Sequence, residues 1–175
     1  MLSASQQQDY GLYAMANRVR SGDPDNLEAQ AAQRYWPKLM GKTFRRDRYG
    51  AFPNALLNFG YAIIRSSVAR ALCSSGLHPA LGIFHHNRNN NFSLADDLIE
   101  VWRPFIDLRV WTTTRAKVVD SISHEHKKAI LSLMNETISM PDGTLPMHHA
   151  IGRMASSLAS SFDQCQNNIQ LPQHL

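Results

Sequence analysis

Cysteine is scarce in this sequence, and its scarcity excludes two kinds of small domain. The 175 residues contain only Cys73 and Cys165. Two thiols are too few for the disulfide framework of a small secreted domain or for a cysteine-based zinc site. A reducing compartment is therefore the expected location.

Long apolar runs are also missing. The N-terminal segment MLSASQQQDY has glutamines where a signal peptide needs apolar residues. The longest charge-free stretches, Tyr49 to Ile64 and Ala71 to Asn87, contain proline, glycine and asparagine. Both are shorter than the roughly 18 apolar residues of a membrane-spanning helix. We therefore expect a soluble cytoplasmic protein with no membrane association.

Residues that favour β-strands are few, which indicates an all-α fold. Valine and isoleucine together number 16, against 18 alanines and 18 leucines. The 43% of hydrophobic residues is enough for one ordinary core, and the length suits a single domain. We predict a helical domain over residues 1–165 and a flexible C-terminal tail over residues 166–175.

About six helices are expected from the apolar periodicity and its interruptions. Turn chemistry at residues 21–26, 76–79 and 141–143 separates them, and Pro104 is read as a helix stop. Ser93, with Asp96 three residues later, predicts a capping box. The expected helices are Ser3–Val19, Leu27–Leu39, Asn54–Gly76, Ser93–Arg103, Ser123–Met140 and Leu145–Phe162.

Positive charge is concentrated in the middle of the chain. The formal net charge is +4, yet Arg34 to Arg88 contains nine basic residues and one acid, Asp47. From Asp96 onward there are nine acids and seven bases. A polyanion such as nucleic acid is the natural partner of such a segment. A solvated face with no partner fits the charge count equally well.

A polar stripe runs along the otherwise apolar third helix. Asn54, Asn58, Tyr61 and Arg65 follow one another at spacings of 4, 3 and 4, so they share one face. Buried polar groups without partners cost about 1–3 kcal/mol each. We read Asn54 as an N-cap, and we expect Asn58 and Arg65 either to line a site or to face solvent.

Acids and histidines gather around the fourth expected helix. Asp97 and Glu100 lie on that helix, and His85 with His86 lies just before it. Carboxylate oxygen with imidazole nitrogen suits Mn²⁺, with Mg²⁺ as an alternative. From the residues alone, an ion pair between Glu100 and Arg103 is the preferred interpretation of Glu100.

Glu28 has an ordinary interpretation as well. It stands in the first turn of its helix, where the helix dipole favours an acid. Its alanine neighbours would also allow another element to approach that face. The remaining paired histidines have no clustered acids or cysteines and are read as surface residues: His124, His126, His148 and His149.

Three ordered segments resemble a known family. They are NLEAQAAQRYW (Asn26 to Trp36), NALLNFGYAIIRSSVARALCSSGLHPALGIFHHNR (Asn54 to Arg88) and FSLADDLIEVWRPFID (Phe92 to Asp107). They resemble the C-terminal catalytic domain of the CRISPR-associated spacer-acquisition integrase, a metal-dependent DNA endonuclease. The double histidine and the Asp-Leu-Ile-Glu sequence are most similar to the branch found with single-effector systems.

The resemblance implies a metal site. In that family a glutamate, a histidine and an acid from three successive motifs bind one divalent ion, and these roles fall on Glu28, His85 and Glu100. His86 is the second histidine of the pair, and Asp97 matches a supporting acid. The implied cofactor is Mn²⁺ or Mg²⁺, and the helical domain would surround it.

The resemblance also implies the reaction. Members of the family cleave DNA and join its 3′-hydroxyl ends to the repeat by phosphoryl transfer. Asn58 would line the site beside the metal. The expected contacts to the backbone of double-stranded or branched DNA are the basic residues Lys38, Lys42, Arg45, Arg46, Arg48, Arg65 and Arg88.

Family members carry a β-rich domain ahead of this region. Because Glu28 stands so near Met1, the sequence implies that this domain is absent. The family resemblance implies a homodimer in the full-length form and a small ferredoxin-like CRISPR adaptation partner protein. Two alternatives stay open, a non-catalytic DNA-binding or assembly fragment and a hydrolase of small phosphorylated substrates.

Overall fold

Seven α-helices make up most of the chain that the structure describes, residues 10–115 and 121–173 of this computed structural model. The all-α prediction is therefore confirmed, with one short β-hairpin added. The elements are α1 (Leu12–Ala16), α2 (Leu27–Met40), α3 (Asn54–Ser74), α4 (Ser93–Ile99), α5 (Arg103–Arg115), α6 (His124–Ser132), a 3₁₀ turn (Leu133–Asn135), β1 (Thr137–Met140), β2 (Gly143–Pro146) and α7 (Met147–Gln164).

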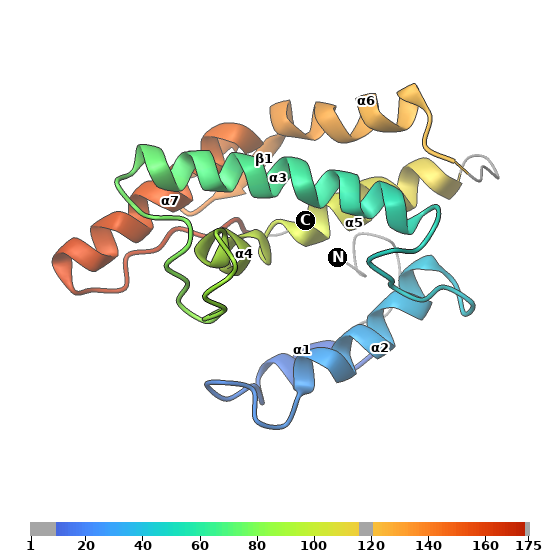
Figure 1. Cartoon of the computed structure of the whole chain (residues 1–175), viewed down its shortest axis with the longest axis horizontal. Coiled ribbons are helices and arrows are strands. Elements are labelled where there is room, and N and C mark those ends of the chain that lie inside the picture. The colour runs from blue at the N-terminus through green and yellow to red at the C-terminus, as the bar shows by residue number, and fades with distance from the viewer. Residues whose placement is uncertain (1–9, 116–120, 174–175) are drawn as a thin grey trace.

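Helix α3 is the centre of the fold. Figure 1 shows it crossing the middle of the molecule, and it packs against α4, α5, α6 and α7. Its core face includes Leu57 and Ile64, both fully buried. A Cβ atom on Gly60 would lie 2.6 Å from Cγ2 of Ile106, so glycine permits the close approach of α3 and α5. Helix α3 ends at Ser74, two residues before the predicted end, and Gly76 is left-handed with φ of 78°, as expected of a residue that stops a helix.

Helices α1 and α2 form a pair beside this body, and Figure 1 shows them below α3. The predicted start of α2 is confirmed. Asp23 caps it from the preceding turn, because its two carboxylate oxygens accept the backbone N–H groups of Leu27 and Glu28, each at 2.9 Å. Within the described residues the first expected helix is shorter than predicted, because α1 begins at Leu12 and ends at Ala16; residues 3–9 of the expected helix lie outside the described part of the chain.

The predicted fourth helix is wrong at its end. Helix α4 stops at Ile99, and a new helix, α5, begins at Arg103. Pro104 stands in the first turn of α5, where the missing N–H costs no hydrogen bond. The predicted capping box of α4 is also wrong, because the Ser93 hydroxyl donates to the carbonyl of Asn90 at 3.1 Å.

The predicted helix from Ser123 to Met140 is wrong beyond Ser132. Residues of β1 pair antiparallel with β2, with Ile138 opposite Leu145. Ile138 and Met140 are buried while their neighbours in β1 are exposed, which is the alternation of a strand packed on one face. The breaking sequence at residues 141–143 thus makes a hairpin turn rather than a break between helices.

The interpretation of His126 as a surface residue is wrong. It is only 6% exposed, and it caps α6 together with Ser123. The Ser123 hydroxyl accepts the His126 backbone N–H at 3.2 Å, and the His126 ring accepts the Ser123 N–H at 3.0 Å.

The chain after α7 runs along the domain. The backbone N–H of Gln170 donates to the Ser157 hydroxyl at 2.9 Å, and that of Gln173 donates to the carbonyl of Ser139 at 2.8 Å. The flexibility of this tail stays a prediction, and residues 174–175 lie outside the described part. No helix among the described residues is both long and apolar enough to cross a membrane.

Candidate functional site

A cavity of about 720 Å³ opens beside α3, where α4 gives way to α5. The loop between α2 and α3 forms one wall, and the loop between α3 and α4 forms another. The lining residues are Arg46, Arg48, Tyr49, Asn58, Tyr61, Ala62, Arg65, His85, Asn87, Asn90, Asp96, Ile99, Glu100 and Arg103. Four of these are arginines, so the cavity suits an anionic ligand.

His85 is held in place by Asp97. The ring Nδ1 of His85 lies 2.6 Å from Oδ1 of Asp97, and the same carboxylate accepts the backbone N–H groups of Ile83, Phe84 and His85 at 2.6, 3.0 and 3.1 Å. Burial opposes ionisation of Asp97, yet these hydrogen bonds outweigh it and lower the pKa of its carboxyl. Because the ionised carboxylate can only accept, Nδ1 carries the hydrogen of this bond, and in the neutral ring the lone pair of His85 is on Nε2.

Gly82 makes this arrangement possible. A Cβ atom there would fall on the carbonyl oxygen of His85 and lie 3.1 Å from Oδ2 of Asp97. The backbone therefore approaches Asp97 more closely than any other residue would allow.

Asp96 does not cap α4, contrary to the sequence interpretation. Its carboxylate accepts Nε and Nη2 of Arg65 at 2.6 and 2.8 Å, and Nδ2 of Asn90 at 2.7 Å. Burial opposes its ionisation, but the bonds from Arg65 and Asn90 lower the pKa of Asp96. The Arg65 guanidinium is thus engaged in joining α3 to α4, although Arg65 lines the cavity as expected.

Glu100 stands at the end of α4, where the helix breaks. Its Oε1 lies 3.0 Å from Nη2 of Arg103, so the ion pair preferred from the residues alone is present. Burial raises the pKa of Glu100; Arg103 and His85 oppose that rise, and Glu28 and Asp96 add to it. Glu28 and His85 are therefore close enough to act electrostatically on Glu100.

Glu28 approaches this group from α2. It does not line the cavity but a neighbouring groove, which it shares with Phe84, the residue before His85. Across residues 10–115 and 121–173, no three His, Cys, Asp or Glu side chains lie close enough together to form a metal-ligand cluster. Glu28, His85 and Glu100 share one electrostatic neighbourhood, and only His85 and Glu100 share the cavity.

The donor chemistry of these three side chains fits a divalent cation. Glu28 raises the pKa of Glu100, which is the like-charge repulsion that a bound cation would offset. His85 presents a free ring nitrogen, and its other nitrogen is held by a carboxylate, the usual arrangement behind a ligating histidine.

The polar stripe of α3 holds the basic loop. Asn54 is not an N-cap; its Oδ1 accepts Nη1 of Arg46 at 3.1 Å and the backbone N–H of Asp47 at 2.9 Å. Oδ1 of Asn58 accepts Nη2 of Arg46 at 2.6 Å, and the Arg46 guanidinium stands 5.3 Å from the centre of the Tyr61 ring. Asn58 therefore lines the cavity and also holds Arg46 in the cavity wall.

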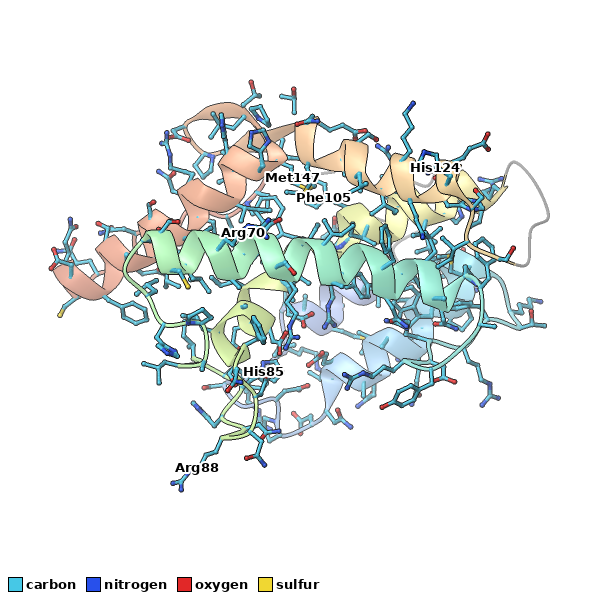
Figure 2. The ribbon with its side chains drawn as sticks, turned by 45° about the horizontal axis from the view of Figure 1, so that its top comes forward. Arg70, His85, Arg88, Phe105, His124 and Met147 are labelled. Atoms are coloured by element: carbon cyan, nitrogen blue, oxygen red, sulfur yellow. The ribbon has the colours of Figure 1, made fainter. Side chains whose placement is uncertain are left out.

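Of the predicted DNA contacts, Arg46, Arg48 and Arg65 line the cavity. The others lie around it. Lys42 and Arg45 line an adjoining groove of about 630 Å³. Lys38 is exposed on α2, with its ammonium 4.2 Å from the centre of the Tyr10 ring. Figure 2 shows Arg88 at the outer end of its loop, pointing away from the helices. His86 is exposed and does not line the cavity.

Arg103 and Asp107 are two of the site residues that the sequence does not predict. Arg103 lines the cavity as well as pairing with Glu100, whereas the sequence predicts only the ion pair. Asp107 is 3% exposed, and it accepts hydrogen bonds from the hydroxyls of Tyr35 and Tyr61 behind the cavity. The signal for Asp107 was an acid between Ile106 and Val110 on an apolar helix face, which requires buried partners.

Comparisons with known proteins identify a family for this chain. The family model described as CRISPR associated protein Cas1 matches residues 25–140. The CRISPR-associated endonuclease Cas1 of Neisseria meningitidis serogroup C is 38% identical over 166 residues, which cover 94% of this chain and 54% of that protein. An endonuclease Cas1 of Francisella tularensis subsp. novicida is 29% identical over 160 residues, covering 83% and 50%.

Two solved structures share the fold. A casposase bound to its integration product has a TM-score of 0.76 at 18% identity, over 96% of this chain and 59% of that one. A Cas1 protein from Thermotoga maritima has a TM-score of 0.73 at 18% identity, over 94% and 62%. The chain spans about half the length of the Neisseria and Francisella relatives.

Proposed function

This chain belongs to the CRISPR-associated Cas1 family of endonucleases and integrases, and from that membership we propose that it cleaves DNA and joins DNA 3′-hydroxyl ends to the CRISPR repeat during spacer acquisition. The observation that carries the proposal is the position of His85. Its ring is held by Asp97, and it lines the same arginine-rich cavity as Glu100. The reaction is phosphoryl transfer, with a 3′-hydroxyl as nucleophile in joining and water in cleavage.

Glu28, His85 and Glu100 would hold one Mn²⁺ or Mg²⁺. When bound, the ion polarises a phosphate oxygen and stabilises the charge that develops on the 3′ oxygen. The Nδ1–H of His85 donates to Asp97, and this bond leaves Nε2 to face the ligand position. Arg103 balances the charge of Glu100 until the site is loaded.

The arginines of the cavity would bind the DNA backbone. Arg46 and Arg48 come from the loop that the α3 asparagines hold, so they reach the cavity from a fixed wall. Lys38, Lys42, Arg45 and Arg88 would extend this contact outside the cavity. Guanidinium groups pair with phosphate oxygens through two parallel hydrogen bonds, and such contacts read no sequence.

The proposal includes the setting of the reaction. The protein would act in the cytoplasm on double-stranded or branched DNA. Its full-length form would be a homodimer that assembles with a small ferredoxin-like CRISPR adaptation partner protein. Its resident ion would be Mn²⁺ or Mg²⁺.

The test is strand transfer and nicking on branched DNA with Mn²⁺, measured at several protein concentrations. Glu28→Ala, His85→Ala and Glu100→Ala should each lower the rate by at least a hundredfold, because each removes a proposed ligand. His124→Ala and Glu125→Gln, which change exposed residues of α6, are the matched controls. Wild-type rates in all three ligand variants would show that the site is assigned wrongly.

One observation favours a second function. The three proposed ligands do not form a compact cluster within the described part of the chain. A non-catalytic DNA-binding or assembly fragment would need no such cluster. It would bind DNA in a salt-sensitive way and show no Mn²⁺-dependent turnover at any protein concentration, which the same assay separates from catalysis.

A further inference from the structure

Helix α2 carries Glu28, yet it has few helix neighbours. Among the described elements it packs mainly against α1, while α3 packs against four other helices. In Figure 1 the α1–α2 pair lies apart from the α3-centred body. Side chains near the C-terminal end of α2, such as the half-buried Trp36 and Met40, attach α2 to that body.

One polar contact joins α2 to two helices of the body. The Tyr35 hydroxyl of α2 donates to Oδ2 of Asp107 on α5 at 2.9 Å. The Tyr61 hydroxyl of α3 donates to Oδ1 of the same carboxylate. Each oxygen of this 3%-exposed carboxylate thus has one phenol partner, and three helices meet at one buried group.

The position of Tyr35 on α2 relates this contact to Glu28. The two residues are seven apart, which is nearly two turns, so their side chains leave the helix within about 20° of each other and about 10 Å apart along its axis. A contact that fixes Tyr35 therefore fixes the rotation of α2 about its axis. That rotation decides where the Glu28 carboxylate points.

We propose that Asp107 is a positioning residue that, through Tyr35, holds α2 at the rotation that directs Glu28 toward Glu100. The inference rests on the metal-ligand role given to Glu28 under the proposed function. Asp107 would touch neither metal nor DNA and would act only through α2.

The phenols are suited to this task because Asp107 needs them. Burial raises the pKa of Asp107 to about 6, and the hydrogen bonds of Tyr61 and Tyr35 oppose that rise. A buried carboxylate oxygen without a partner is costly, so the contact with Tyr35 is maintained in the folded protein. Removing only the Tyr35 hydroxyl breaks the contact and keeps the ring beside Trp36, whose centre is 5.0 Å away.

Hydrogen–deuterium exchange of the full chain, without metal or DNA, tests the positioning directly. Tyr35→Phe and Asp107→Asn should speed exchange of the α2 amides several-fold and leave those of α7 unchanged. Tyr61→Phe removes the other phenol from the same carboxylate, and it should leave α2 exchange unchanged because α2 keeps its own bond. Wild-type α2 exchange in Tyr35→Phe would overturn the inference.

Mn²⁺ binding in the absence of DNA tests the consequence for Glu28. Tyr35→Phe should weaken Mn²⁺ binding by about tenfold, in the range seen for residues that orient metal ligands. Ile106→Val, which loosens the same helix α5 without touching Asp107's partners, should lower thermal stability and leave Mn²⁺ affinity unchanged. Equal losses of affinity in Tyr35→Phe and Ile106→Val would also overturn the inference.

Failure of the proposed function has a different signature. If Glu28→Ala binds Mn²⁺ as well as the wild type, Glu28 is not a ligand and the proposed site is wrong. That result is independent of whether Tyr35→Phe changes α2 exchange, so the two failures are distinguishable.

Discussion

At the scale of the residue, the interaction between Asp97 and His85 predicts a measurable effect on metal binding. Asp97→Asn keeps the size of the side chain but removes the charge that holds the His85 ring and three backbone N–H groups. We expect Mn²⁺ affinity to fall by about 10–100-fold, as for other residues that orient a ligand. Isothermal titration with Mn²⁺ measures this.

The matched control for this variant is Asp142→Asn. Asp142 also pairs with a cation, Arg153, but in the hairpin turn far from the cavity residues in sequence. Its replacement should leave Mn²⁺ affinity unchanged. An unchanged affinity in Asp97→Asn would instead mean that His85 needs no support or is not a ligand.

Asp107 should give the protein a distinctive pH dependence. Its pKa of about 6 lies above the ordinary value of 3.8, so between those values the folded protein holds a proton that the unfolded chain has released. The contribution of Asp107 to the free energy of unfolding therefore increases as the pH falls from about 6 toward 4. The groups around it are Tyr61, Tyr35, Arg103 and Arg46.

Urea unfolding at several pH values, compared between the wild type and Asp107→Asn, isolates this contribution. The wild type should gain about 1–3 kcal/mol relative to the variant between pH 7 and pH 4. Asp96 and Asp97, whose pKa values are lowered, act in the opposite direction in both proteins and cancel in the comparison. A pH-independent difference would contradict the raised pKa.

The sequence predicts the positions of the site side chains better than it predicts their hydrogen-bond partners. Asn54, Asn58 and Arg65 were placed on one face of a helix, and the structure has them there. Their partners, Arg46 and Asp96, were not predictable, because a helix period gives the direction of a side chain and says nothing of what another segment brings to it.

At the scale of the element, the crossing of α3 and α5 depends on Gly60. Gly60→Ala would place a methyl group within 2.6 Å of Ile106, so the helices must separate. We expect the free energy of unfolding to fall by about 1–3 kcal/mol. Denaturant unfolding measures it, with Gly152→Ala as control, since a Cβ on Gly152 of α7 meets nothing within 4 Å.

The control should be neutral or stabilising, because alanine favours a helix over glycine by about 1 kcal/mol. A Gly60→Ala variant as stable as the wild type would mean that α3 and α5 can separate without loss of packing. The comparison distinguishes close approach from helix propensity, which act in opposite directions at Gly60.

Long elements with clear end signals were predictable, and short ones were not. Helices α2 and α3 have the predicted starts because Asp23 and Pro53 lie beside strong turn residues. No glycine or proline marks the end of α4 before Glu100. Pro104 predicts the end of a helix from the sequence, but it stands in the first turn of α5. The β1–β2 hairpin was not predictable, because the four residues Thr137 to Met140 are too few for an alternation of apolar and polar residues to be distinguished from a helical pattern.

At the scale of the whole molecule, the distribution of basic residues predicts how DNA binding responds to salt. If Arg45 and Arg48 contact phosphates, each replacement by alanine should reduce the slope of log K against log salt by about 0.7–0.9. Lys128→Ala on α6, an exposed residue distant in sequence from the basic loop, should leave the slope unchanged. Fluorescence anisotropy with labelled branched DNA measures these slopes.

Equal slopes for the wild type and both loop variants would place the DNA elsewhere on the protein. A reduced slope with no preference among DNA sequences would agree with contacts to the backbone alone. The sequence predicted which third of the chain is basic; it did not predict that Arg46 and Arg65 would be engaged by Asn54, Asn58 and Asp96.

The contacts of Arg46 with Asn54 and Asn58 have one more consequence. A long side chain that becomes ordered only on binding loses about 0.5–1.5 kcal/mol of conformational freedom at that moment. Arg46 has already lost this freedom when the chain folds. If the cavity binds DNA as proposed, the Arg46 guanidinium keeps its position during binding. The cavity wall would then favour a strand whose backbone path matches that position.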